Sequence, residues 1–360
     1  MKAHVLEGIN KLEYKEVEVP RPKPHEVLVE VKAAGICGSD VPRVFETGTY
    51  HFPTIPGHEF SGIVVDVYDE EGVPWKGKRV GVFPLIPCKS CPSCLKSQYE
   101  MCSNYNYLGS RCDGGFAEYV AVPIWNLIEL PDAICYEEAA MLEPAAVALH
   151  AVRRLQLEEV HSVALFGLGT IGIMIAEWLH IFGIHTVFAT GHREEHGELM
   201  RKVSSVDYKY LDSRNCNIVE TIMTATDGLG MDAVIDCVGT SSSLSDAIAC
   251  VCPGGQIVEV GNPKTGVELE KNIYWKILRK QIRLTGTWNS TFTHEEQDDW
   301  NTVLKECKEG RLKLQELITH KFPFEELHRG LELMRDKTEY RNKVMILQEV
   351  FDKKVSFVIH

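Results

Sequence analysis

The sequence predicts an α/β protein that combines a mostly-β domain with a doubly wound parallel sheet. In the first half, apolar and polar residues alternate with the period of a strand, as in Glu26–Lys32 and Gly62–Val67, and Gly and Pro separate the runs. From about Pro144 onward, short apolar runs alternate with helical stretches, the pattern of a parallel sheet. That alternation fades from about Gly286, so we expect the C-terminal segment to rejoin the first domain.

The expected elements of the parallel sheet follow one another along the chain. Buried strands are expected at Val163–Phe166, Thr186–Ala189, Ala233–Ile235 and Gln256–Val260, and helices at Ile171–Phe182, Asn217–Thr226 and Ser242–Val251. A length of 360 residues is large for one core and favours two domains.

Composition and charge exclude several classes of protein. A formal net charge of -13 argues against broad binding to the phosphate backbone of nucleic acid. The start of the chain lacks the pattern of a signal peptide, and the longest uncharged run, Val163–Ala176, is too short to span a bilayer. We therefore expect a cytoplasmic protein with a small-molecule substrate and no membrane partner. Its 12 cysteines then need a role other than disulfide bonding, because that compartment is reducing.

One loop has the cysteine spacing of a zinc site. Cys88, Cys91, Cys94 and Cys102 lie within fifteen residues and are flanked by prolines. Four thiolates suit a closed tetrahedral Zn²⁺ site, which leaves no position for a reactant. We predict a structural zinc site here; the alternative is a set of free or redox-active cysteines.

A glycine-rich turn follows the strand at Val163–Phe166 and opens an apolar helix. Its residues are Gly167, Leu168, Gly169, Thr170, Ile171 and Gly172. In this context G-x-G-x-x-G is typical of a dinucleotide site, where the pyrophosphate meets the helix N-terminus. Val238 and Gly239 are further candidates for cofactor binding. The alternative is a tight strand–helix turn without a ligand.

The residues after the next strand bear on which nucleotide binds. An NAD site usually has Asp or Glu there, whereas this chain has Gly191, His192 and Arg193. A guanidinium can bind a 2′-phosphate with two hydrogen bonds, so we predict a preference for NADP(H). NAD(H) remains the alternative, because Glu194 or Glu195 could still reach the ribose.

Three separate segments supply ligands of the kinds that a catalytic zinc site uses. Cys37 and His58 are the predicted ligands, and Glu59 or Glu143 would complete the set directly or through water. Catalytic zinc keeps three protein ligands and one open position, where it acts as a Lewis acid. Ser39, two residues after Cys37, is the predicted proton acceptor, although its hydroxyl could instead cap a turn.

Together these residues make the sequence resemble the zinc-containing medium-chain dehydrogenase/reductase superfamily over nearly its whole length. Within it, the polyol dehydrogenases, and galactitol-1-phosphate 5-dehydrogenases above all, are the most similar. The segments that carry the resemblance are Cys37–Phe45, Pro56–Gly62, Gly109–Tyr119 and Lys276–Lys280, followed by Gly286–Trp288.

The resemblance implies a GroES-like catalytic domain and a Rossmann nucleotide domain. The first would comprise residues 1–148 and 287–360 and the second residues 149–286. It also implies a homodimer or homotetramer, and a polyol-type zinc site marked by Glu143. Many relatives carry a proton-conducting histidine where this chain has Pro42. The tail, residues 348–360, is either an interface segment or a frayed end.

The expected reaction is hydride transfer between NAD(P) and a secondary alcohol of a polyol or sugar phosphate. Arg43 is the first candidate for holding the substrate phosphate, because phosphate-free relatives tend to have an aromatic residue there. Arg111, Arg279 and Lys280 are weaker candidates. One alternative is a sorbitol- or threonine-dehydrogenase-type enzyme with an unphosphorylated substrate. A more remote alternative is a non-catalytic protein that binds zinc or nucleotide.

Overall fold

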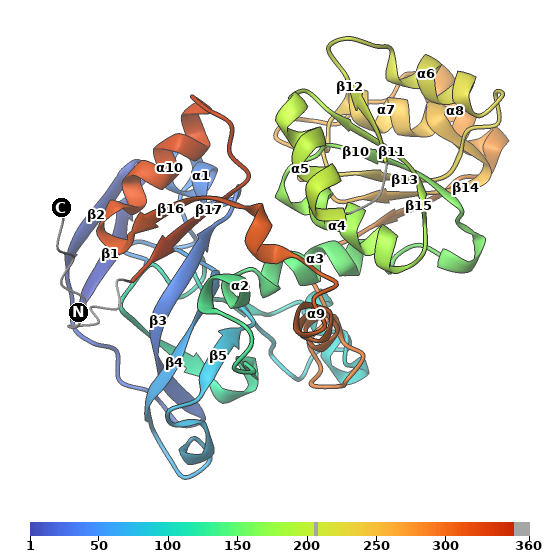
Figure 1. Ribbon diagram of the computed structural model, residues 1–360. Helices are drawn as coiled ribbons and strands as arrows, with labels where there is room; N and C mark the ends of the chain where they lie inside the picture. The colour runs from blue at the N-terminus through green and yellow to red at the C-terminus, as the bar shows by residue number, and fades with distance from the viewer. Residues whose placement is uncertain (205–207, 349–360) are drawn as a thin grey trace, which may run out of the picture. The chain divides into compact units, whose positions relative to one another are not determined.

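The computed structural model describes residues 1–204 and 208–348, which form two compact units (Figure 1). The first unit comprises Met1–Ile86, Tyr105–Met141 and the segment from Ile318 onward, and the second comprises Pro87–Asn104 and Leu142–Leu317. The predicted tail lies outside the described residues beyond Gln348. Within the described ranges, no helix is both long enough and apolar enough to cross a membrane.

The first unit is built on a largely antiparallel sheet with the strand order β16-β17-β3-β4-β5-β9, and β8 also pairs with β3. The pair β1–β2 and the pair β6–β7 form two further small sheets. The strands are β1 (Lys2–Gly8), β2 (Lys11–Glu16), β3 (Glu26–Ile36), β4 (Glu59–Val67), β5 (Arg79–Val82), β6 (Leu85–Ile86), β7 (Asn106–Tyr107), β8 (Tyr119–Pro123), β9 (Leu127–Glu129), β16 (Ile318–Pro323) and β17 (Lys343–Leu347). The helices are α1 (Asp40–Pro42), α2 (Tyr136–Ala140) and α10 (Leu327–Asp336).

Strand β3 is the centre of this sheet. Its alternating residues Val27, Val29 and Val31 are buried in the core, where they join Phe60 and Val64 of β4. Neighbouring strands β4, β8 and β17 all pair with β3 in antiparallel register. Its C-terminal end is therefore held firmly, which fixes the residues that follow it.

The second unit contains a parallel six-stranded sheet with the order β12-β11-β10-β13-β14-β15. Helices α4 and α5 form one layer and α6, α7 and α8 another (Figure 1). The strands are β10 (Ser162–Phe166), β11 (Thr186–Gly191), β12 (Lys209–Asp212), β13 (Met231–Asp236), β14 (Val251–Glu259) and β15 (Arg283–Gly286). The helices are α3 (Leu142–Val152), α4 (Thr170–Ile181), α5 (Glu194–Ser204), α6 (Ile218–Ala225), α7 (Ser241–Cys250), α8 (Lys271–Lys280) and α9 (Asp299–Lys308). This order is that of a Rossmann dinucleotide-binding fold, and the predicted fold class is confirmed.

The second compact unit also includes the cysteine loop, α3 and the stretch from Thr287 to Leu317. Helix α3 is buried along most of its length and packs against α4 and α9.

Helix α4 buries an acidic side chain that has a testable effect on stability. Glu177 is 2% exposed; one carboxylate oxygen accepts the Lys313 N–H at 3.1 Å, and the other has no hydrogen-bond partner among the described residues. Burial raises its pKa from 4.5 to about 7. The unfolded chain thus loses this proton at lower pH than the folded one, so stability falls as the pH rises between these values.

Glu177→Gln is accordingly expected to raise the free energy of unfolding by about 3 kcal/mol at pH 8, and by little at pH 4.5. Urea unfolding of both proteins across this range measures the difference. Glu198→Gln, an exposed change on α5, is the control and should shift stability equally little at every pH. Parallel pH profiles for the Glu177 variant and the unmodified protein would contradict the argument.

Candidate active site and metal sites

Three predicted ligands meet where β3 ends and β4 begins. Because Gly35 pairs with Glu59 in the antiparallel ladder, Cys37, just beyond β3, lies close to His58, just before β4. The Cys37 Sγ, a ring nitrogen of His58 and a carboxylate oxygen of Glu59 all lie within 4.8 Å of one another. One sulfur, one nitrogen and one oxygen donor thus converge from two strands.

A buried carboxylate, whose role the sequence did not reveal, supports this cluster. Asp40 is fully buried, accepts the Cys37 N–H at 3.0 Å and lies 3.5 Å from His58 Nδ1. Although burial alone would raise its pKa, the neighbouring His58 and Arg43 hold the pKa of Asp40 below its usual range. Asp40 therefore remains an anion that can orient the imidazole, as carboxylates behind metal-binding histidines do.

Glu59 has a buried cation as its partner. The Lys343 ammonium donates to Glu59 Oε2, and both side chains are almost fully buried. Lys343 Nζ also donates to the Ile36 carbonyl at 3.4 Å. Gly35 makes room for this carboxylate, because a Cβ at that position would collide with Glu59 Oε2. Lys343 thus compensates the charge of Glu59 within the fold.

Removing this cation should be costly. Lys343→Met leaves the Glu59 carboxylate buried without its partner and is expected to lower the free energy of unfolding by about 3–5 kcal/mol. Adding Glu59→Gln should recover most of that loss, whereas Glu59→Gln alone costs less than Lys343→Met. Denaturant unfolding of the four proteins forms a double-mutant cycle. Additive losses would show that the two side chains are not coupled.

The donor set fits zinc, since thiolate, imidazole and carboxylate are the ligands of catalytic zinc sites. Ser39 is exposed, and its hydroxyl donates to Cys37 Sγ at 3.3 Å, beside the cluster. Glu143 is buried in the first turn of α3, in the second unit, and its part in the metal site stays a prediction.

The predicted phosphate-binding cations differ in their surroundings. Arg43 donates to Asp40 Oδ1 at 2.7 Å, and its side chain is 18% exposed. Lys280 donates to three backbone carbonyls at the end of α7, while Arg279 stacks on Trp275. Arg111 instead lies between two tyrosine rings.

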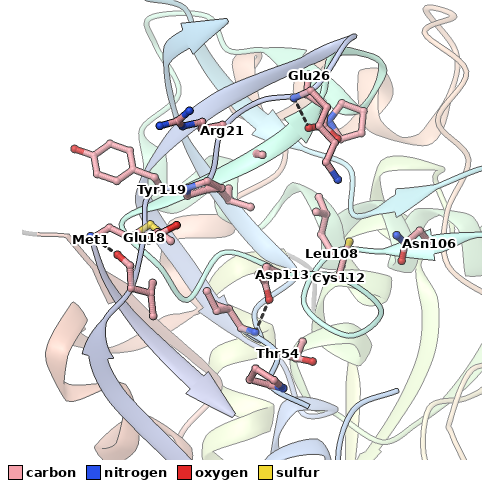
Figure 2. Close-up of a pocket in the computed structure, with 18 of the residues that line it drawn as sticks. Met1, Glu18, Arg21, Glu26, Thr54, Asn106, Leu108, Cys112, Asp113 and Tyr119 are labelled. Atoms are coloured by element: carbon pink, nitrogen blue, oxygen red, sulfur yellow. Dashed lines mark hydrogen bonds between the residues drawn. The ribbon is translucent and has the colours of Figure 1, made fainter. Parts of the chain in front are cut away.

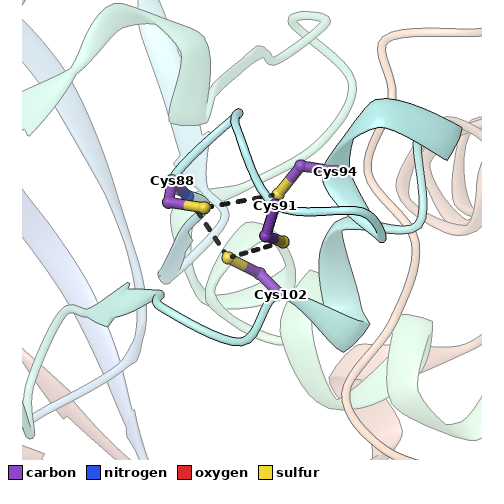
Figure 3. Close-up of side chains that lie close together, drawn as sticks. All are labelled: Cys88, Cys91, Cys94 and Cys102. Atoms are coloured by element: carbon purple, nitrogen blue, oxygen red, sulfur yellow. Dashed lines mark hydrogen bonds between the residues drawn. The ribbon is translucent and has the colours of Figure 1, made fainter.

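The four cysteines of the loop converge on one point, as Figure 3 shows. Cys88 Sγ lies 4.0 Å from Cys94 Sγ, and Cys91 Sγ lies 3.9 Å from Cys102 Sγ. Sulfurs at the corners of a tetrahedron around Zn²⁺, each about 2.3 Å from it, are separated by about 3.8 Å. Backbone N–H groups of Cys94 and Ser103 lower the pKa of the Cys91 thiol to about 5, which favours the thiolate that zinc requires.

The glycine-rich turn has the geometry that a dinucleotide needs. Gly167 has a φ of +89°, and a Cβ on Gly172 would collide with the Gly167 carbonyl oxygen. A Cβ built on Gly169, the residue before α4, would meet nothing within 4 Å, and no side chain caps that helix. The turn therefore leaves open space for a phosphate at the helix N-terminus.

The other predicted cofactor residues lie at the same edge of the parallel sheet. Val238 is 45% exposed, and one of its methyl groups would lie 2.9 Å from a Cβ on Gly167. Gly239 has a φ of +73° and packs against Gly261. Gly191 ends β11, next to exposed His192 and half-buried Arg193.

A separate cavity of about 420 Å³ lies in the first unit, and none of the predicted site residues lines it (Figure 2). Asp113 is at its edge, where it accepts the Ile55 N–H at 2.8 Å. This cavity therefore plays no part in the metal cluster, but its wall anchors the loop that carries Arg111.

Comparison with known proteins agrees with this geometry. Residues 23–132 match the alcohol dehydrogenase GroES-like domain family, and residues 170–309 match the zinc-binding dehydrogenase family. Galactitol 1-phosphate 5-dehydrogenase of Escherichia coli K12 is 31% identical over 83% of this chain and 86% of its own. The chain belongs to the zinc-binding medium-chain dehydrogenases. It is accordingly an enzyme of the zinc-dependent alcohol and polyol dehydrogenase type, as predicted.

Other members of the family are similar to comparable degrees. Sorbitol dehydrogenase of Bacillus subtilis is 28% identical over 92% of this chain and 93% of its own. A solved structure of the Escherichia coli CFT073 short chain alcohol dehydrogenase (rspB), complexed with NADH, has a TM-score of 0.87 at 28% identity and covers 96% of this chain and 99% of its own. The solved structure of a Sinorhizobium meliloti protein assigned to the zinc-binding dehydrogenases, bound to NADP, has a TM-score of 0.85 at 27% identity. It covers 96% of this chain and 98% of its own.

Proposed function

We propose that this dehydrogenase transfers hydride between NAD(P) and a secondary alcohol, or the matching ketone, of a polyol or sugar phosphate. The galactitol-1-phosphate 5-dehydrogenase and ketose-1-phosphate reductase reactions are of this type. The observation that carries the proposal is the convergence of Cys37, His58 and Glu59 within 4.8 Å, beside an exposed Ser39 hydroxyl. The donor set resembles that of polyol-type zinc sites more than that of sites with a second cysteine.

The residues of the site have separate roles in the proposed reaction. Bound zinc would supply a Lewis acid that lowers the pKa of the substrate hydroxyl, and nicotinamide would accept the hydride. Cys37 and His58 hold the metal, with Asp40 behind the imidazole, and Glu59 or Glu143 provides an oxygen ligand directly or through water. Ser39 Oγ accepts the proton, and because its side chain is exposed, water can take that proton where relatives use a histidine at the position of Pro42.

A steady-state screen tests this function. Polyol phosphates, free polyols and their ketoses are assayed with NAD(H) and NADP(H), before and after zinc chelation. We expect zinc-dependent turnover, with a phosphorylated polyol or ketose as the best substrate. Selective turnover of sorbitol or threonine would favour the second candidate, which the identity to sorbitol dehydrogenase supports. Absence of turnover with all of them would overturn the proposal.

For the nucleotide, we propose a preference for NADP(H). The residues at the end of β11 and just after it, Gly191, His192 and Arg193, include no Asp or Glu. The carboxylate opposite Gly191 in the sheet is Asp212, and Arg214 donates hydrogen bonds to both of its oxygens. That contact lowers the pKa of Asp212 to about 2 and partly offsets its charge. Arg214, which was not among the predicted cofactor residues, follows β12 and is paired with Asp212.

The expected kcat/KM is higher for NADP+ than for NAD+, and Arg193→Ala should reduce that ratio roughly tenfold. The loss should come from the NADP+ value alone, because the arginine is proposed to contact only the 2′-phosphate. Measurement of kcat/KM for both nucleotides, in both proteins, checks this. A clear NAD+ preference of the unmodified enzyme would contradict it.

We further propose that the protein forms a homodimer or homotetramer through the β15 edge of its parallel sheet. Strand β15 ends the strand order, and its Leu284 side chain is 47% exposed. Tyr274, Trp275 and Leu278 of α8 are also about half exposed. An exposed strand edge beside exposed apolar side chains is a pairing surface, and a second copy would cover it. Light scattering should give an oligomer that Leu284→Lys converts to monomers; a monomeric unmodified protein would refute this.

A further inference from the structure

The loop that carries Arg111 is built against the residue before His58. Gly109 has a φ of +81°, and a side chain there would collide with the backbone of Gly57. The Gly115 N–H donates to the Gly57 carbonyl at 2.8 Å, and Asp113 is bonded to Ile55. The position of this loop relative to His58 is therefore fixed by backbone contacts.

Aromatic rings connect the imidazole to the guanidinium. The ring centroids of His58 and Tyr107 are 5.8 Å apart, and those of Tyr107 and Tyr105 are 6.2 Å apart. The guanidinium carbon of Arg111 lies 4.4 Å from the Tyr105 ring centroid. Tyr107 and Tyr105 thus link Arg111 to His58 through a series of ring contacts.

Arg111 is held in place, and no carboxylate of the described residues is paired with it. Its guanidinium carbon is 4.0 Å from the Tyr50 ring as well, so two phenol rings enclose it. Its carbonyl is hydrogen-bonded to His51 Nε2 at 3.1 Å. Among the described residues no carboxylate forms an ion pair with it, and its buried Nε has no hydrogen-bond partner. A guanidinium enclosed in this way is pre-organised to bind an anion.

Arg43, the other arginine near the cluster, already forms an ion pair with a carboxylate. Arg43 is paired with the buried Asp40, and breaking this pair would leave that carboxylate uncompensated. A ligand phosphate would have to compete with Asp40 for Arg43, but not for Arg111. The observations therefore favour Arg111 over Arg43 as the group that recognises a substrate anion.

We propose that Arg111, enclosed by Tyr50 and Tyr105, binds the phosphate of a phosphorylated polyol whose reacting hydroxyl lies at the Cys37–His58–Glu59 cluster. This rests on the proposed function and specifies how the enzyme selects its substrate. The guanidinium donates two hydrogen bonds to phosphate oxygens, while the tyrosine rings hold its plane. A free polyol leaves Arg111 without a partner and binds more weakly.

Arg111→Gln tests the proposal, with Arg111→Lys as a second variant in case the first folds poorly. The matched control is Arg21→Gln, which removes an exposed arginine of the same unit, at the cavity of Figure 2. Kinetics are measured with a hexitol phosphate, the unphosphorylated hexitol and the corresponding aldonate. Binding of the hexitol phosphate is measured separately by calorimetry without the oxidised nucleotide, so it does not depend on turnover.

We expect Arg111→Gln to raise KM and Kd for the hexitol phosphate roughly 10- to 100-fold and to leave KM for the free hexitol within about threefold. Arg111→Lys should show a smaller loss of the same selectivity, and Arg21→Gln should show none. Equal losses on both hexitols, or unchanged phosphate binding, would overturn the proposal. A loss confined to the aldonate would overturn it too, in favour of a carboxylate site. Failure of the proposed function is distinguishable, because turnover would then be missing from the unmodified enzyme on every substrate.

Discussion

His58→Ala is expected to lower kcat/KM roughly a thousandfold or more and to remove one zinc ion per chain. A metal Lewis acid contributes several kcal/mol to the stabilisation of the transition state, and each 1.36 kcal/mol is a factor of ten in rate. The imidazole is buried, and among the described residues of the cluster, Cys37, His58 and Glu59, it is the one nitrogen ligand. Initial rates and elemental analysis of the same preparations measure both effects.

His328→Ala is the matched control, because it removes an exposed histidine from α10 in the same unit. It should keep both zinc ions and its activity. His58→Gln, which preserves more of the side-chain volume, is expected to fold normally but to be as inactive as the alanine variant. A His58 variant that retained more than a tenth of the activity with its full zinc content would show that the imidazole is not a catalytic ligand.

Cys94→Ser is expected to release the other zinc ion and to destabilise the second unit. Binding free energy at a structural zinc site is folding free energy, so losing a ligand should cost about 3 kcal/mol or more. In a unit of about 200 residues, such as the second one, that corresponds to a fall in its melting temperature of roughly 5–10 °C. Below that temperature the variant should remain active, because Cys37, His58 and Glu59 lie in the first unit and the cysteine loop lies in the second.

Cys250→Ser serves as the control for burying a hydroxyl, since Cys250 is fully buried in the core of the second unit and is not part of the cysteine loop. It should retain two zinc ions. If Cys94→Ser also retained two zinc ions and melted like the control, the loop would hold free cysteines, which is the alternative that the spacing left open. Calorimetric melting and elemental analysis distinguish these results.

The parts of the site that the sequence predicts are those encoded by local spacing. The four cysteines are close together in the chain, so their convergence follows from one loop. The glycine-rich turn is likewise a single strand–helix junction, and its predicted strand and helix are confirmed. Cys37 and His58 come from different segments, and their meeting was predicted from ligand chemistry and family resemblance.

Side-chain partners that lie far apart in the sequence could not be predicted from it. Lys343 is 284 residues from Glu59 in sequence, and a lysine is rarely fully buried, so no pattern indicated the pair. Arg43 and Asp40 are three residues apart, a spacing that could have shown that they pair. The strands β12 and β15 were missed because each is short and partly exposed, without the apolar runs of the central strands.

Anomalous scattering at the zinc absorption edge, from crystals of the protein as purified, tests the central claim most directly. We predict two peaks per chain, one equidistant from the four loop sulfurs and one bonded to both Cys37 Sγ and a ring nitrogen of His58. A single peak at the cysteine loop, with no metal between Cys37 and His58 in fully zinc-loaded and active protein, would contradict the proposed catalytic centre.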